Sequence, residues 1–157
     1  MPLPFLHKFM ASARRTNFEL QPQSETAHLW PLSLIGPDGP QMLAFEIMGL
    51  GEAAPRKAGI FIYARKRGSE WQALFIGESA NLSARLAFNE IAADALLSGA
   101  TDIHILKTNL DAAERRDLAD RLILTNRPPL NEEERLRLAT LAPKVDAKPA
   151  KGKSRAA

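Results

Sequence analysis

The chain contains no cysteine among its 157 residues. This absence excludes a disulfide scaffold, a thiolate zinc site and a cysteine nucleophile. Long hydrophobic runs are also lacking, so the sequence predicts no membrane-spanning segment. The opening residues, MPLPFLHKFMASARR, place their charges after the apolar residues, whereas a secretory signal has the reverse order. We therefore expect a cytoplasmic protein with no membrane partner.

Positive charge is in slight excess, with a formal net charge of +3, and the excess lies at the C-terminal end. Residues 143–157 hold five Lys or Arg side chains against one Asp, so the rest of the chain is slightly acidic. This tail has little to bury, which predicts a disordered segment. It is either a basic arm that binds phosphate without sequence preference or a solvated C-terminus.

The pattern of apolar residues predicts an α/β fold in which helices pack on a small, mostly antiparallel sheet. Residues 28–47 form one hairpin, and Pro31 confines its first strand to the edge of the sheet. A second hairpin joins the strands expected over 59–64 and 71–77 across a polar turn. The other expected elements are a helix from Ala80 with Ser79 as its N-cap, a helical segment to Leu97, a strand over 101–106, a helix over 112–124 capped by Asp111, and a helix over 132–141 capped by Asn131.

These elements divide the chain into three segments. Residues 1–57 form an N-terminal extension that includes the first hairpin, residues 58–142 form the main α/β domain, and residues 143–157 form the disordered basic tail. The extension has no assigned role in the main domain. It is therefore a candidate docking module for a protein partner.

Short motifs recur in a fixed order along the main domain. Gly59-Ile60-Phe61 and Phe75-Ile76-Gly77 lie on the two strands of the second hairpin, Asn81-Leu82 and Arg85-Leu86 follow on the next helix, and Pro128-Pro129-Leu130-Asn131 comes far downstream. This ordered set resembles the GIY-YIG nuclease superfamily over about half of the chain. The resemblance implies a nuclease fold that cuts phosphodiester bonds with one divalent metal ion, Mg or Mn.

The resemblance also assigns roles to individual positions. It implies that Arg85 orients the phosphate, that Asn131 supports the site, and that Gly77 is a motif glycine. Asn89 stands four residues after the arginine, where the family often has His or Tyr. Arg85, Asn131, Gly77 and Gly59 match the family pattern, whereas Asn89 departs from it.

Three other positions lack the atoms that the family chemistry needs. The two motif tyrosines are Phe61 and Phe75, and the metal-binding Glu falls at Ala119. Phenylalanine has no hydroxyl group, and alanine has no oxygen ligand. Tyr63 is on the same strand face as Phe61 and is the candidate replacement base. Asp120 and Asp117, beside Ala119, are the candidate metal ligands.

Further residues have both a binding and a structural interpretation. Phe61 and Phe75 are either stacking platforms for bases or core residues. Arg65, Lys66 and Arg67 form a basic hairpin tip that either contacts phosphate or is simply solvated. Arg85 either faces phosphate or pairs with Glu78 or Glu90. His104 alternates on a strand and is interpreted as structural.

The sequence therefore supports three functions. The first is a nucleic-acid-binding protein with impaired or lost nuclease activity, the second is an active metal-dependent endonuclease, and the third is a protein-interaction scaffold. We favour the first because the missing hydroxyl and carboxylate groups are those that do the chemistry.

Overall fold

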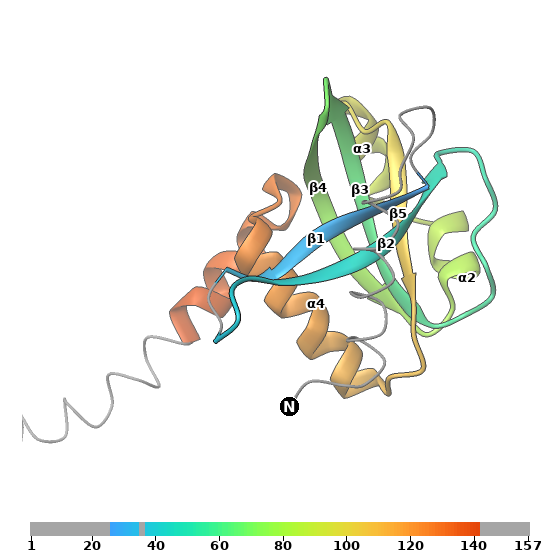
Figure 1. Cartoon of the computed structure of the whole chain (residues 1–157). Coiled ribbons are helices and arrows are strands. Elements are labelled where there is room, and N and C mark those ends of the chain that lie inside the picture. The colour runs from blue at the N-terminus through green and yellow to red at the C-terminus, as the bar shows by residue number, and fades with distance from the viewer. Residues whose placement is uncertain (1–25, 35–36, 142–157) are drawn as a thin grey trace, which may run out of the picture.

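The computed structural model describes residues 26–34 and 37–141. It shows a five-stranded sheet flanked by helices (Figure 1). The predictions for the first 25 residues and for the basic tail lie outside this part of the chain. No helix within the described ranges is long and apolar enough to cross a membrane.

All strand pairs in the sheet are antiparallel, and the strand order is β1-β2-β5-β3-β4. The predicted first hairpin is confirmed as β1 (Ala27–Ser33) and β2 (Gln41–Gly49). Pro31 lies on β1 at the edge of the sheet, as expected for a residue without a backbone N–H. β2 pairs with β5 (Asp102–Lys107), so the sheet continues across the boundary that the sequence indicated at residue 57.

The second hairpin is formed by β3 (Gly59–Arg67) and β4 (Glu70–Ser79) and is longer than expected. Residues 65–67 were predicted to be a turn, but they continue the strand, with Arg65 opposite Gln72 and Arg67 opposite Glu70. The turn is confined to two residues, and Gly68 adopts a positive φ of 63° there. Glycine tolerates this conformation without a steric penalty.

The helices α2 and α4 begin with side-chain caps, whereas α3 and η1 have none, and the cap predicted for α2 was wrong. Asn81, and not Ser79, caps α2 (Leu82–Ala87), because Ser79 is the last residue of β4 and its hydroxyl group bonds to the Asn81 backbone. Asp111 caps α4 (Ala112–Asn126) as predicted and forms a capping box with Glu114. The other helical segments are α3 (Ala92–Leu97), the 3-10 turn η1 (Pro129–Asn131) and residues 132–141.

Two hydrophobic cores lie on opposite faces of the sheet. On one face, α4 packs its Leu118, Leu122 and Ile123 against Ile60 and Ile62 of β3. On the other face, α2 and α3 cover a second core that includes Leu82, Ala95, Phe61, Tyr63 and Ile103. The alternation of β3 residues between the two faces follows from the two-residue period of a strand. We call the second face the α2 face.

Candidate functional site

The α2 face brings together most of the motif residues of the second hairpin. Phe61 pairs with Gly77 across the strands, and Tyr63 pairs with Phe75. A methyl group added at Gly77 would lie 2.5 Å from the Phe61 ring, so the ring occupies the space that glycine leaves open. The two motifs are therefore linked by packing, and a side chain at position 77 would displace the aromatic ring.

Phe61 and Phe75 differ in their exposure. Phe61 is fully buried, with an exposed fraction of 0%, so a base cannot stack on it and the core interpretation is the one realised. Its ring centroid lies 6.0 Å from that of Phe75, which is only partly buried. The stacking prediction is thus corrected for Phe61 and stays a prediction for Phe75.

Arg85 extends from α2 over the ring of Phe61. Its guanidinium carbon lies 5.7 Å from the ring centroid, within the range of a cation–π contact. In the part of the chain that the structure describes, no hydrogen bond or ion pair reaches this guanidinium group. Its donors are therefore available to an anion, which is the property that a phosphate-binding arginine needs.

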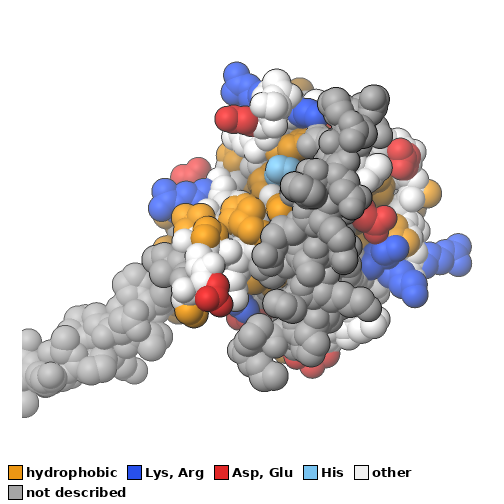
Figure 2. All heavy atoms as spheres, viewed as in Figure 1, with side chains coloured by type: hydrophobic (Ala, Val, Ile, Leu, Met, Phe, Trp, Pro, Cys, Tyr) orange, Lys and Arg blue, Asp and Glu red, His pale blue; other side chains and the backbone are white. Residues whose placement is uncertain are grey.

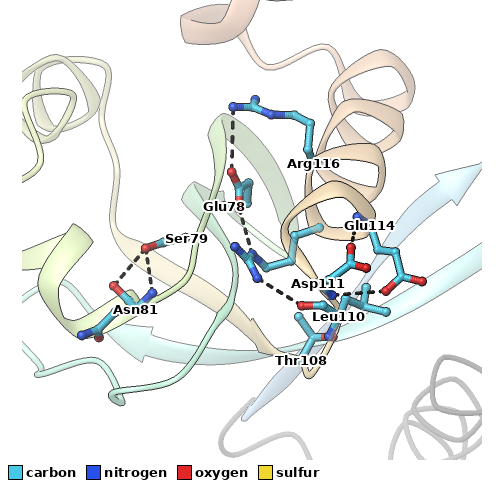
Figure 3. Close-up of polar contacts among 9 residues, drawn as sticks. Glu78, Ser79, Asn81, Thr108, Leu110, Asp111, Glu114 and Arg116 are labelled. Atoms are coloured by element: carbon cyan, nitrogen blue, oxygen red, sulfur yellow. Dashed lines mark hydrogen bonds and ion pairs between the residues drawn. The ribbon is translucent and has the colours of Figure 1, made fainter.

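Neither alternative partner pairs with Arg85 among the described residues: no ion pair joins it to Glu90, and Glu78 is occupied elsewhere. Glu78 on β4 binds the Arg115 side chain of α4, with 2.9 Å between Oε1 and Nε, and also lies 3.8 Å from Arg116 (Figure 3). Arg115 is buried and donates a second hydrogen bond to the Leu110 carbonyl group. Because these contacts lie between β4 and α4, Glu78 serves to hold that helix on the sheet.

Tyr63 on β3 contacts the loop between α2 and α3. The Asn89 side chain donates a hydrogen bond of 3.2 Å to the Tyr63 hydroxyl oxygen. Burial raises the pKa of Tyr63 above 10.0, although the Asn89 hydrogen bond and the charge on Arg85 act in the opposite direction. The phenol is therefore protonated at neutral pH, which opposes its use as a general base.

The candidate metal ligands lie on the other face of the sheet. Ala119 is buried in the core under α4, whereas Phe61 and Tyr63 face α2. Asp117 pairs with Arg121 at 3.4 Å and is exposed. Burial raises the pKa of Asp120, whose charged neighbours are Arg116, Glu134, Asp117 and Arg137. Neither carboxylate is thus brought to Arg85, and the described residues contain no group of three potential metal ligands.

Asn131 has a structural role that the sequence did not predict. Its side-chain oxygen accepts a hydrogen bond of 2.7 Å from the Ile76 N–H, and its amide donates to the Ile76 carbonyl group at 3.0 Å. Asn131 is buried and also donates to Glu134. It therefore satisfies the outer backbone groups of the edge strand β4. Its side-chain oxygen bonds to this strand, and not to the start of the helix over 132–141 that the sequence predicted it to cap.

The basic side chains of the hairpin tip are partly engaged in contacts within the fold. Arg65 donates to the Ser98 carbonyl at the end of α3 and to the Gln72 side chain, so its guanidinium is held within the fold. Lys66 lies 5.3 Å from the centre of the Trp71 ring. Arg67 is exposed. On the face of the molecule in Figure 2, the basic side chains of the described residues lie in several separate places, with acidic side chains close to most of them.

An exposed aromatic residue near Arg85 was missed by the sequence analysis. Phe88, the C-cap residue of α2, is 87% exposed, and Leu97 at the end of α3 is equally exposed. Phe88 follows Arg85 by three residues and ends the helix that carries Arg85. That spacing was visible in the sequence, but an apolar residue at that position is expected in a core, and only the tertiary structure shows its exposure.

No family model, curated protein or solved structure matches this chain. The assignment of a function therefore depends on the geometry of the α2 face.

Proposed function

We propose that the α2 face binds nucleic acid, as a GIY-YIG-like protein that has lost the metal-dependent cleavage of that family. The observation that carries this proposal is the Arg85 guanidinium, which lies over Phe61 beside Tyr63 without an ion pair in the described chain. A buried or half-buried cation without a partner is costly, and a bound phosphate would compensate for it. Phe88 adds an exposed ring on which a base can stack.

The groups on the α2 face support the proposed loss of cleavage. Phosphodiester hydrolysis needs a positioned metal or an activated water near the phosphate-binding cation. The carboxylates of α4 are separated from Arg85 by the sheet, and the Tyr63 phenol has a raised pKa. The α2 face thus has the means to hold a phosphate group, but the family's Glu falls at Ala119 on the other face. The carboxylate that lines the α2-face pocket, Glu52, is on an exposed loop.

The test is the affinity of the protein for a labelled single-stranded oligonucleotide, measured by fluorescence anisotropy. The substitution Arg85→Ala should weaken binding by about tenfold or more, because it removes charge-assisted hydrogen bonds to phosphate. Arg121→Ala is the matched control, since Arg121 is an exposed arginine on α4 that pairs with Asp117. Equal affinities of the two variants would contradict the proposal.

The same proteins are incubated with plasmid DNA and Mg²⁺ or Mn²⁺. We expect no cleavage by the wild-type protein. Cleavage that Arg85→Ala abolishes would instead establish the alternative, an active metal-dependent endonuclease.

A protein-interaction scaffold is a second candidate because Phe88 and Leu97 are each 87% exposed. Large exposed apolar side chains that cluster on one face are typical of protein contacts. The substitution Phe88→Ala separates the two roles in the same anisotropy assay. Weaker binding of the single strand supports base stacking, whereas unchanged binding favours a protein contact at this position.

A further inference from the structure

A pocket of about 240 Å³ opens on the α2 face, between the loop after β2, the helices α2 and α3, and the sheet. Its walls are mostly aliphatic and include Leu86 of α2, Leu96 of α3 and Ile103 of β5. Pockets for drug-sized ligands have volumes of roughly 300 to 1,000 Å³. This pocket is smaller, so it fits a single planar ring system better than an extended ligand.

Three polar side chains line the same pocket, namely Glu52, Tyr63 and Ser83. Glu52 is exposed on the loop and, when ionised, only accepts hydrogen bonds. The Tyr63 oxygen accepts from Asn89, while its own proton has no acceptor among the residues that the structure describes. The pocket therefore offers both an acceptor and a free donor to an occupant, within apolar walls.

The pocket and the Arg85 guanidinium are joined through Tyr63 and α2. Ser83, Leu86 and Ala87 line the pocket from the helix that also carries Arg85. The Tyr63 ring lies 6.1 Å from the Phe61 ring, centre to centre, and Phe61 carries the guanidinium on its face. A ligand that places a phosphate at Arg85 and a flat heterocycle in the pocket would thus contact both sides of Tyr63.

We propose that this pocket receives one unstacked nucleobase of the strand whose phosphate Arg85 binds, an inference that rests on the proposed function. A base fits because it is flat, largely apolar on its faces, and carries hydrogen-bonding groups on its edge. Glu52 favours bases with an exocyclic amino group, which donates to the carboxylate, and thymine has no such group. The protein therefore binds single strands in preference to duplexes and adenine-rich strands in preference to thymine-rich ones.

The experiment compares three fluorescent chains of equal length: oligo(dA), oligo(dT) and an abasic deoxyribose-phosphate chain. The wild-type protein should bind oligo(dA) about tenfold more tightly than the abasic chain. The substitution Ala87→Leu enlarges an exposed side chain that lines the pocket and so narrows it, and this variant should bind oligo(dA) no more tightly than the abasic chain. Ala84→Leu is the matched control, because Ala84 lies on the same helix, is exposed and does not line the pocket.

A second variant, Glu52→Ala, alters an exposed loop residue and does not depend on how the pocket tolerates a larger side chain. It should reduce the preference for oligo(dA) over oligo(dT). If Ala87→Leu and Glu52→Ala both keep the wild-type preferences, the pocket proposal is wrong, while loss of affinity for the abasic chain in Arg85→Ala would still support the proposed function. If the wild-type protein binds none of the three chains, both proposals fail.

Discussion

At the scale of the residue, His104 shows how burial fixes a protonation state. Its side chain is fully buried in the sheet, and the Trp30 indole N–H donates a hydrogen bond of 2.9 Å to Nδ1. Nδ1 must therefore carry a lone pair, so the proton of the neutral ring is on Nε2, which has no hydrogen-bond partner among the described residues. Burial, together with the nearby His28, lowers the pKa of His104 from 6.5 to about 3.

This shift predicts a loss of stability in mild acid. In the unfolded chain His104 becomes protonated below about pH 6.5. In the folded protein it stays neutral down to about pH 3. The free energy of unfolding should therefore fall by about 1.4 kcal/mol per pH unit within this window. The measurement is urea unfolding at pH 7.5 and pH 5.0.

The variant His104→Gln separates this titration from that of the acidic residues, which both proteins share. It should be less stable than the wild type at pH 7.5, because a buried ring is lost, yet it should lose less stability between the two pH values. An equal loss in both proteins would show that His104 does not cause the acid sensitivity.

The sequence predicted which residues share a face better than it predicted their contacts. The motif pattern led to Arg85, Tyr63 and Asn89, which the structure brings together on one face. The position of Ala119 relative to Arg85 was not predictable from the helix pattern, since an amphipathic helix can cover either face of a sheet. The role of Asn131 was hidden because its contact with Ile76 joins residues 55 positions apart.

At the scale of the element, local sequence signals were sufficient to predict most of the strands and helices. Alternation and turn residues predicted both hairpins, and Asp111 marked the start of α4. The pairing of β2 with β5 was not predictable in this way, because no turn joins the two strands. The edge strand β4 likewise depends on a distant residue, since Asn131 satisfies the outward N–H and C=O of Ile76.

Removing this contact should destabilise the fold. Asn131→Ala leaves two backbone groups of β4 without partners in a buried place, and we expect a loss of about 2 to 3 kcal/mol in the free energy of unfolding. Asn81→Ala is the control, because Asn81 is an exposed asparagine whose side chain caps α2 and whose loss should cost about 1 kcal/mol. Both values come from urea unfolding, and equal losses would contradict the assigned role of Asn131.

At the scale of the whole molecule, the first hairpin shares a sheet and a core with the residues that follow it. β2 is hydrogen-bonded to β5, and Trp30, Leu43 and Phe45 pack in the same core as α4. Burial of side chains of this size contributes about 1.5 to 3 kcal/mol each, which is comparable in sum with the total stability of a small domain. The hairpin is therefore part of what stabilises the α2 face.

A truncated protein tests this dependence. The fragment 58–157 lacks β2, one of the two strands that pair with β5, and should show no cooperative thermal unfolding by circular dichroism. The control, residues 1–142, lacks only the tail that composition predicts to be disordered, and its unfolding midpoint should match that of the full chain. A cooperative transition of the fragment at the full-length temperature would establish residues 58–142 as an independent domain.

The central place of β5 also determines when the nascent chain can complete its sheet. The two hairpins are made first, but β5, the last strand of the five, lies between β2 and β3 and joins them. Until residues 102–107 have been synthesised, each hairpin presents an inner edge with unpaired backbone groups. The interval between the synthesis of β4 and that of β5 is therefore the period in which this chain is most exposed to aggregation.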